Sequence, residues 1–173
     1  MQFYDVINAR RSIRKYKDTP VPPETIHRIL DAGRKAPSWK NMQCWRYILI
    51  SDTALKAQLG ELLKNPSADC YRDAPFALVL CALPAESGSE DGKEYYLVDS
   101  AISMDHVVLA ATAEGLATCW VGLFTEQPVR ELLAIPDEVK IVAITPLGYP
   151  AQERNPRPRK ALEEIVFENK WNA

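Results

Sequence analysis

The longest apolar stretch of the chain runs from Val98 to Phe124, and its first half predicts a buried helix. Asp99 and Ser100 are suitable residues for a helix start, and from Ala101 onward nearly every position is apolar. A helix that is apolar on nearly all sides has to be buried on nearly all sides. In a chain of this size, such a helix suggests that a second subunit covers part of it, so a homodimer is our working hypothesis.

The second half of the same stretch predicts the end of the helix and a short strand. Gly115 is a natural helix stop, because glycine readily adopts the left-handed conformation that ends many helices. Thr118 to Val121 then has the composition of a strand, and Gly122 closes it. We therefore expect the chain to cross its core twice here, once as a helix and once as a strand.

Shorter patterns predict the rest of the fold. Apolar residues at helical spacing indicate helices over 3–9, 23–35, 53–63 and 126–133. Continuous apolar runs indicate strands over 46–50, 76–83 and 139–145, and the second of these is expected to be central and buried on both faces. Loops are expected at Asn65, Pro66, Ser67 and Asp69 and over 84–93, and an abrupt turn over 146–150. Helices that alternate with about four strands predict an α/β or α+β sheet sandwich.

Composition and charge argue against several classes of protein. The 173 residues fit one domain, which at this length buries roughly two thirds of its unfolded surface. With 21 basic and 23 acidic residues the net charge is −2, so the balance does not indicate nucleic acid or a membrane surface as a partner. The sequence has no run long enough to span a membrane and no signal-peptide core, so we expect a soluble cytoplasmic protein.

The four cysteines are expected to be reduced thiols that fill the core. They are widely spaced and form no CxxC pair, which argues against a zinc site, an iron–sulfur cluster or a dithiol. We therefore expect no metal. The four are Cys44, Cys70, Cys81 and Cys119.

Two basic clusters are candidates for anion binding. Residues 10–15 carry four arginines or lysines and Ser12, and in an extended backbone Ser12 and Arg14 share one direction while Ile13 packs the other way. Arginine forks bind phosphate oxygens in pairs, and a serine hydroxyl adds a donor. A solvated basic edge is the alternative for this segment. The second cluster contains Arg154, Arg157, Arg159 and Lys160 and lies among Pro150, Pro156 and Pro158; it either extends into solvent or supplies cations to a site formed elsewhere.

The loop from Ala36 to Trp45 mixes tryptophans with amide side chains. This combination suits a heterocycle that has both a flat apolar face and hydrogen-bonding edges, although a turn with two packed tryptophans explains it equally well. Signatures of other chemistries are missing, because the sequence has no GxGxxG after a strand, no Walker loop, no GxSxG and no paired metal ligands. One phosphate and one flat heterocycle would engage both basic clusters and this loop.

Five segments in this order resemble the FMN-dependent nitroreductase family, and with their connections they cover nearly the whole chain. They are RRSIRKY, APSWKNMQCW, DSAISMDHVVLAATAEGLATCWVGLF, PLGYP and PRPRKALEEIV. The resemblance implies an α+β fold, a three-layer sandwich with a mixed or antiparallel central sheet flanked by helices. It also implies an intertwined homodimer with FMN at the subunit interface. The implied activity is ping-pong hydride transfer through flavin N5, from NADH or NADPH as transient reductant to a small-molecule electron acceptor.

The resemblance also implies roles for individual residues. Arg10, Arg11 and Ser12 match residues that bind the FMN phosphate and ribityl chain, and Arg157 and Arg159 match residues that close on the phosphate. Arg14 matches the basic residue near flavin N1 and O2, and the Gly122 amide matches the one directed at N5; these two are the implied catalytic groups. The loop that meets the ring from the neighbouring subunit corresponds to Pro37, Ser38, Trp39 and Asn41. Trp120 and Val121 match residues beside the ring, and Pro146 and Gly148 match a tight turn near the cofactor.

Departures from the family pattern leave the substrate open. Cys44 stands where the family usually has proline, and the loops at 65–69 and 84–93 are short where longer members carry helices over the site. We therefore expect an open site that accepts nitroaromatics, quinones or activated alkenes. The alternatives are a reductive specialist of the same fold, such as an enone reductase or a dehalogenase, a flavin-binding sensor or carrier without turnover, and, more remotely, a module that binds phosphate ligands or nucleic acid.

Overall fold

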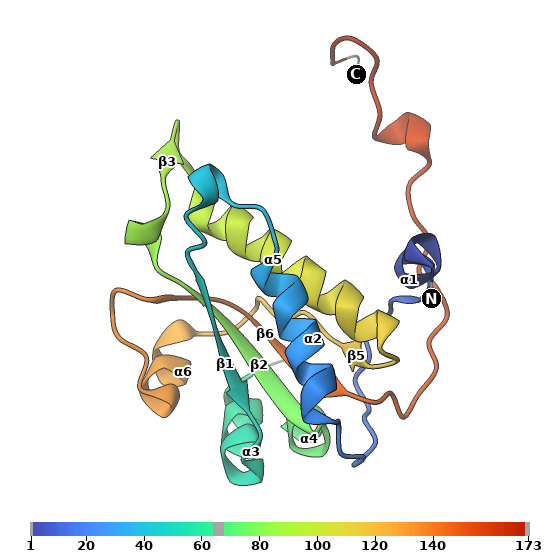
Figure 1. Cartoon of the computed structure of the whole chain (residues 1–173), viewed down its shortest axis with the longest axis vertical. Coiled ribbons are helices and arrows are strands. Elements are labelled where there is room, and N and C mark those ends of the chain that lie inside the picture. The colour runs from blue at the N-terminus through green and yellow to red at the C-terminus, as the bar shows by residue number, and fades with distance from the viewer. Residues whose placement is uncertain (1, 64–67, 172–173) are drawn as a thin grey trace.

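The fold consists of a four-stranded sheet with helices on both faces (Figure 1). The computed structural model describes residues 2–63 and 68–171. Its helices are α1 (Phe3–Ala9), α2 (Pro23–Arg34), α3 (Thr53–Leu62), α4 (Ala68–Asp73), α5 (Tyr95–Ala113) and α6 (Glu126–Leu133). Its strands are β1 (Trp45–Ile50), β2 (Phe76–Ala82), β3 (Ser89–Glu90), β4 (Lys93–Glu94), β5 (Ala117–Thr118) and β6 (Lys140–Gly148). Single 3-10 turns are η1 (Trp39–Asn41), η2 (Pro84–Glu86) and η3 (Leu162–Glu164).

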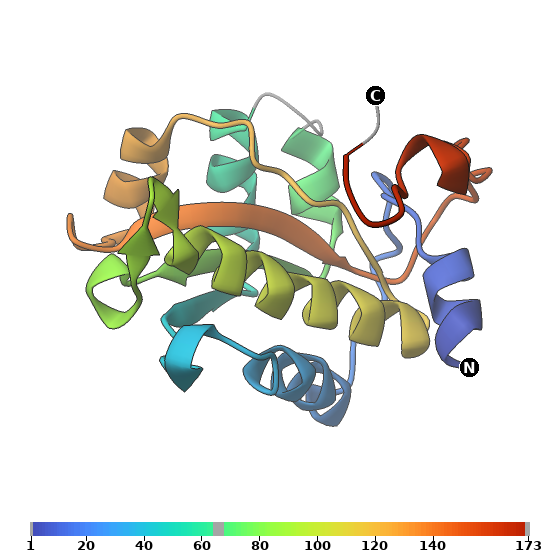
Figure 2. The same cartoon turned by 90° about the horizontal axis from the view of Figure 1, so that it is seen from above.

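The main sheet has the order β1-β2-β6-β5, and each neighbouring pair is antiparallel. Strand β2 lies between β1 and β6, and its side chains alternate between two cores. Val79 belongs to the core that includes residues of α3, α4 and α6, whereas Leu78 and Leu80 belong to the core that includes residues of α2 and α5. Figure 2 shows the resulting layers, with the sheet between the two groups of helices. The predicted three-layer α+β sandwich and its buried central strand are confirmed, and the sheet is antiparallel.

The helix predicted after Asp99 begins one turn earlier than expected. Helix α5 starts at Tyr95, so Asp99 and Ser100 lie inside it, where both are buried. The prediction was wrong because Asp99 accepts a hydrogen bond from a distant segment, the backbone N–H of Trp39, instead of capping its own helix. A cap residue that has found a tertiary partner cannot be recognised from local sequence.

Helix α5 is buried only on the faces that meet the sheet and α2. Met104 and Val107 are fully buried there, whereas Leu97 and Val98 near the helix start are exposed by 46% and 51%. Burial on nearly all sides is therefore not achieved within one chain. The apolar side chains of Leu97 and Val98 stay exposed in the single chain and are available for contact with another molecule.

The abrupt turn predicted over 146–150 is strand over its first three residues. Strand β6 continues through Pro146 to Gly148 instead of turning at Pro146, which pairs with Ala77 of β2. The ladder between β5 and β6 covers only Leu147 and Gly148, so Pro146 lies where one side of the strand lacks a regular partner, a place where strands accept proline. The expectation of a tight turn at Pro146 and Gly148 is therefore wrong.

The remaining loop predictions have mixed outcomes. Asp69 lies in α4 and not in a loop, while Asn65, Pro66 and Ser67 lie outside the described residues. The segment 84–93 is exposed along most of its length, as expected, but it forms η2 and most of the β3–β4 hairpin. Within the described part of the chain, no helix is long and apolar enough to cross a bilayer.

The close approach of α2 to α5 depends on Gly33. A Cβ atom at this position would lie 2.6 Å from Val107 Cγ2 and 2.8 Å from the hydroxyl of Tyr47. That hydroxyl is held by Ser103 Oγ at 2.6 Å, so it cannot move away without breaking a hydrogen bond. The packing therefore excludes a side chain at Gly33.

We expect Gly33→Ala to lower the free energy of unfolding. Overpacking costs about 1–3 kcal/mol, which exceeds the gain of at most about 1 kcal/mol that alanine has over glycine inside a helix. Urea denaturation would measure the change, with His27→Ala on the exposed side of α2 as the control. An unchanged or higher stability of Gly33→Ala would show that α2 and α5 are not packed so closely.

We expect stability to fall steeply in alkali, because buried thiols and phenols resist ionisation. Burial raises the pKa of Cys81 from 9.0 to about 11, that of Cys70 from 9.0 to about 12 and that of Tyr47 from 10.0 to about 12. Above pH 9 the unfolded chain releases protons that the folded chain keeps, so unfolding becomes more favourable as the pH rises. Thermal unfolding between pH 8 and 11 should show this. Cys81→Ala should flatten the slope by up to about 1.4 kcal/mol per pH unit, and an unchanged slope would contradict the assignment.

Candidate functional site

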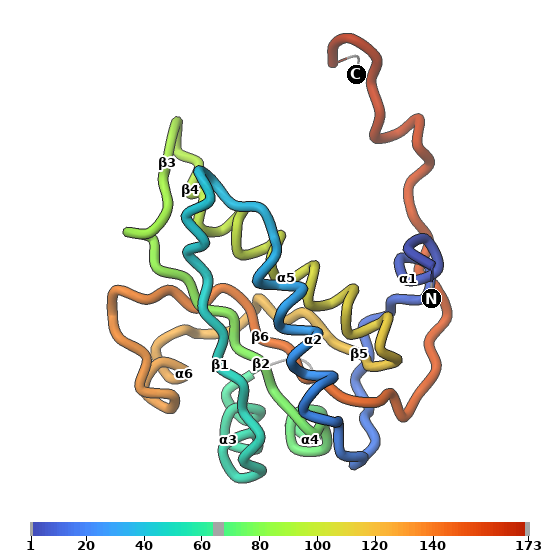
Figure 3. Tube along the Cα trace, in the orientation of Figure 1, coloured from blue at the N-terminus to red at the C-terminus, as the bar shows by residue number. Residues whose placement is uncertain are grey.

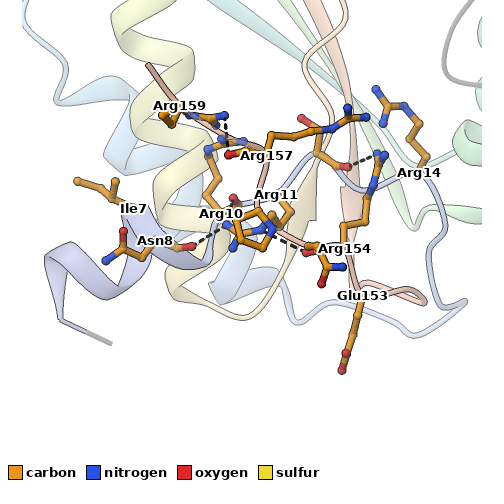
Figure 4. Close-up of a pocket in the computed structure, with 12 residues that line it drawn as sticks. Ile7, Asn8, Arg10, Arg11, Arg14, Glu153, Arg154, Arg157 and Arg159 are labelled. Atoms are coloured by element: carbon orange, nitrogen blue, oxygen red, sulfur yellow. Dashed lines mark hydrogen bonds between the residues drawn. The ribbon is translucent and has the colours of Figure 1, made fainter. Parts of the chain in front are cut away.

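A cavity of about 650 Å³ lies between the end of α1 and the C-terminal tail (Figure 4). It brings together the two basic clusters, which are more than 140 residues apart in the sequence. Its charged and polar lining includes Arg10, Arg11, Ser12, Arg14, Arg154, Arg157 and Arg159. We call this the arginine cavity. The sequence left open whether the first basic cluster forms a solvated edge or an anion site. In the structure, its Arg10, Arg11 and Arg14 line a cavity.

The backbone of residues 12–14 is extended and fastened to the sheet. Ile13 is 4% exposed and belongs to the core, and its backbone N–H donates to the carbonyl of Thr118 at 2.9 Å. Ser12 and Arg14, on either side of it, both line the arginine cavity. The predicted alternation is confirmed, and it explains how an apolar residue between them anchors two residues of the cavity wall.

Two arginines hold the walls of the cavity together. Arg11 donates to the backbone carbonyls of Asn8 at 2.6 Å, Arg10 at 2.7 Å and Arg154 at 3.2 Å. Arg154 donates in return to the carbonyl of Ser12 at 3.1 Å. These bonds cross-link the segment after α1 to the tail, and the dashed lines in Figure 4 follow them.

The cavity has a strong positive charge that acidic side chains do not compensate. Among the residues that the structure describes, none of its six arginines forms a salt bridge. Glu153 is part of the lining, but its carboxylate points away from the cluster (Figure 4). Like charges gathered around a cavity repel one another, and an anion bound among them removes that repulsion. The donor set of guanidinium groups with a serine suits the oxygens of a phosphate.

The segment after β5 extends from the arginine cavity along the sheet. Val121 is buried and exchanges backbone hydrogen bonds with Ile144 at 2.9 Å in both directions, whereas Trp120 is 42% exposed and Gly122 is exposed. Burial raises the pKa of Cys119, and the positive charges of Arg14 and Arg154 act in the opposite direction. Cys119, which precedes Trp120, therefore lies near the positive charges of the cavity.

The segment Pro37–Gln43, which we call the ring loop, lies at the other end of α5. Its anchor is Asp99 near the start of this helix, whereas Arg11 shares a second small cavity with Thr112 near the end. Asp99 and Thr112 are thirteen residues apart in one helix, a rise of about 20 Å. Figure 3 shows the loop between α2 and β1 beside β3 and β4, far from α1. Within one chain, the ring loop and the arginine cavity do not form one site.

The structure thus divides the predicted site residues into two groups. One comprises the cavity arginines and Ser12. The other comprises Pro37, Ser38, Trp39 and Asn41. The segment 120–122 follows Thr118, whose carbonyl accepts from the N–H of Ile13, but it is not part of the cavity lining. From the sequence, Arg154 was expected only as a member of the basic tail, and Asn8 was not expected at the cavity. The signal for Arg154 was present, since it lies in the same basic tail as Arg157 and Arg159, but only the fold shows that it reaches Ser12.

Comparisons with known proteins agree with this architecture. The profile of the Nitroreductase family matches residues 7–69 and 63–149. A protein of Methanothermobacter thermautotrophicus, provisionally named NADH dehydrogenase/NAD(P)H nitroreductase, is 32% identical over 99% of this chain and 88% of its own length. The crystal structure of a nitroreductase family protein from Clostridium novyi NT has a TM-score of 0.84 and 40% identity, and the match covers 90% of each chain.

A longer structural relative shares the same core. The structure of NADPH:FMN oxidoreductase from Vibrio harveyi complexed with NAD+ superposes with a TM-score of 0.88 at 25% identity, over 99% of this chain and 78% of that one. The family profile covers residues 7–149, and the similarity in sequence and in structure covers nearly the whole chain. The chain belongs to the nitroreductase family of oxidoreductases.

Proposed function

We propose that the protein is a homodimeric, FMN-dependent NAD(P)H oxidoreductase that reduces nitroaromatics, quinones or activated alkenes. The observation that carries the proposal is the arginine cavity, where six arginines without a salt bridge in the described part of the chain line one space with Ser12. This donor set fits the phosphate of FMN. The names of two relatives support the cofactor, the Vibrio harveyi NADPH:FMN oxidoreductase and an FMN-dependent nitroreductase from Clostridium difficile R20291.

The distance between the two groups of site residues supports a dimer. An FMN held by Arg10, Arg157 and Arg159 would lie near the end of α5, whereas the ring loop of the same chain is anchored at Asp99, a rise of about 20 Å from Thr112 along this helix. A second copy of the chain would supply that loop. Several apolar side chains that are exposed in one chain are available for such an interface, namely Leu97 and Val98 of α5, Phe3 and Tyr4 of α1, and Leu162, Ile165, Val166 and Trp171 of the tail.

The residues of the chain would then have distinct tasks. Arg10, Arg157 and Arg159 bind the phosphate, while Arg11 and Arg154 keep the cavity walls together. Bound FMN supplies the redox chemistry, in which a hydride from NADH or NADPH is taken up and passed on to a second substrate. Arg14 contributes a positive charge that stabilises the negative charge gained on reduction, and the exposed amide of Gly122 offers a hydrogen bond at the ring.

The site is proposed to be open to acceptors of several shapes. The segment after β2 forms only η2 and a hairpin whose strands have two residues each, and both strands are exposed. A small cover of this kind constrains the substrate less than packed helices would. A reductive specialist would instead show turnover within one narrow chemical class, and steady-state assays with the three acceptor classes would distinguish the two.

The visible spectrum of the purified protein tests the proposal directly. We expect a flavin spectrum that bleaches on anaerobic addition of NADH or NADPH and returns when an acceptor is added. A flavin that neither nucleotide reduces would contradict the oxidoreductase and favour a sensor or carrier. A colourless protein that cannot be reconstituted with FMN would contradict the cofactor.

Arg14 and Arg159 should affect different properties of the bound flavin. We expect Arg159→Ala to weaken FMN binding roughly ten- to hundredfold, because a charge-assisted hydrogen bond contributes about 1.5–3 kcal/mol. Arg14→Ala should lower the flavin midpoint potential and slow reduction more than it weakens binding. Equilibrium titration with FMN and spectroelectrochemistry would measure these quantities, with Arg34→Ala on the exposed face of α2 as the control. Loss of FMN from Arg14→Ala with an unchanged potential in the remainder would contradict the role of Arg14.

A further inference from the structure

The ring loop has an unfavourable backbone conformation. Lys40, Asn41 and Gln43 have φ angles of 47°, 59° and 54°, in the left-handed region that residues with a Cβ atom rarely adopt. Three such residues within four positions persist only where surrounding contacts impose them. The conformation of the loop therefore depends on the contacts that hold it.

Some of these contacts lie within the loop. The hydroxyl oxygen of Ser38 accepts from the N–H of Gln43 at 3.0 Å, and the carbonyl of Ser38 accepts from the N–H of Asn41 at 3.0 Å. The carbonyl of Trp39 accepts from the N–H of Met42 at 2.9 Å. These bonds define the shape of the turn, but they do not attach it to the rest of the protein.

Trp39 attaches the loop to the body of the protein. Its ring stacks on Tyr95 with a centroid distance of 5.9 Å and an interplanar angle of 20°. A Cβ atom at Gly88 would lie 2.8 Å from the same ring, so the hairpin segment also packs closely against it. The backbone N–H of Trp39 donates to Asp99 Oδ1 at 3.0 Å. The start of the turn is thus held by one aromatic side chain, which is partly buried, and one carboxylate.

Asp99 is an unusual residue for this place. It is 4% exposed, in the second turn of α5, and burying a carboxylate is costly unless its oxygens accept hydrogen bonds. Its second oxygen accepts from Ser87 Oγ at 3.3 Å, so one side chain joins the ring loop, α5 and the segment before β3. Burial raises the pKa of Cys44, which follows the loop, and the charge of Asp99 raises it further. Asp99 therefore acts close to both ends of the loop.

We propose that Asp99 is a positioning residue, whose carboxylate holds the ring loop in the strained conformation that presents Ser38 and Asn41 to the flavin of the partner subunit. This inference rests on the proposed function for the identity of the ligand. Asp99 contacts Trp39 and Ser87, so its role would be exerted through the loop. Its charge matters because a carboxylate accepts from a backbone N–H more strongly than a neutral oxygen does.

Hydrogen exchange of the holoenzyme tests this role without depending on turnover. We expect Asp99→Ala to accelerate exchange of the amides of residues 39–43 at least tenfold while leaving the amides of the central strand β2 unchanged. Asp99→Asn, which keeps one acceptor oxygen, should restore exchange to within about threefold of the wild type. Asp105→Ala, an exposed aspartate on the same helix, is the matched control and should behave like the wild type.

The same variants should separate loop positioning from phosphate binding. We expect Asp99→Ala to change the FMN dissociation constant less than tenfold but to slow flavin reduction by NADH at least tenfold, the reverse of the pattern for Arg159→Ala. If Asp99→Ala does not fold, Asp99→Leu, which fills the same space without an acceptor, carries the same expectations.

Two outcomes overturn different statements. Exchange of residues 39–43 in Asp99→Ala or Asp99→Leu at the rate of Asp105→Ala would overturn the positioning role, even if the wild type binds FMN and is reduced. A wild type that binds no FMN would overturn the proposed function, whatever the exchange rates of the loop.

Discussion

The packing of α5 against the sheet and α2 is the constraint on which the rest of the site depends. Helix α5 is fixed relative to the sheet because its buried residues, which include Met104 and Val107, are closely packed. Its start anchors the ring loop through Asp99, and residues near its end approach the arginine cavity. Asp99 and Thr112 are separated along this helix by a rise of about 20 Å, so the ring loop and the arginine cavity lie near opposite ends of it. This separation is the reason that the proposed FMN site includes a second chain.

The arginine cavity and the ring loop have different physical requirements. The cavity gathers like charges, and Arg11 and Arg154 use their guanidinium groups to hold the walls by hydrogen bonds to carbonyls. The ring loop carries strain in three left-handed residues, which are held by contacts of Trp39 and Asp99. An anionic ligand relieves the repulsion of the first, whereas the second stays in place through its own buried contacts. The phosphate-binding and ring-orienting roles that we propose for them thus belong to separate parts of the chain.

Periodicity and composition were sufficient for most of the fold. The helices over 3–9 and 23–34 and the central strand β2 follow from local patterns. The predictions for Asp99 and Pro146 were wrong because segments far away in the sequence decide the structure at both positions. Asp99 is a residue type that often caps helices, and its hydrogen bond to Trp39, 60 residues away, cannot be read from the local sequence. Pro146 is typical of a turn, and the missing strand partner beside it cannot be read locally either.

The sequence by itself determined the chemistry that this protein can offer. The arginines, the amide-rich loop and the alternation around Ile13 are local features, and they were sufficient to indicate a phosphate and a flat heterocycle. Only the tertiary structure decided which of these features share a site. It joined residues 10–14 to the tail across more than 140 residues and placed the ring loop at the far end of α5. The reason is that charge and hydrogen-bonding capacity belong to a residue, whereas proximity depends on how helices and strands pack.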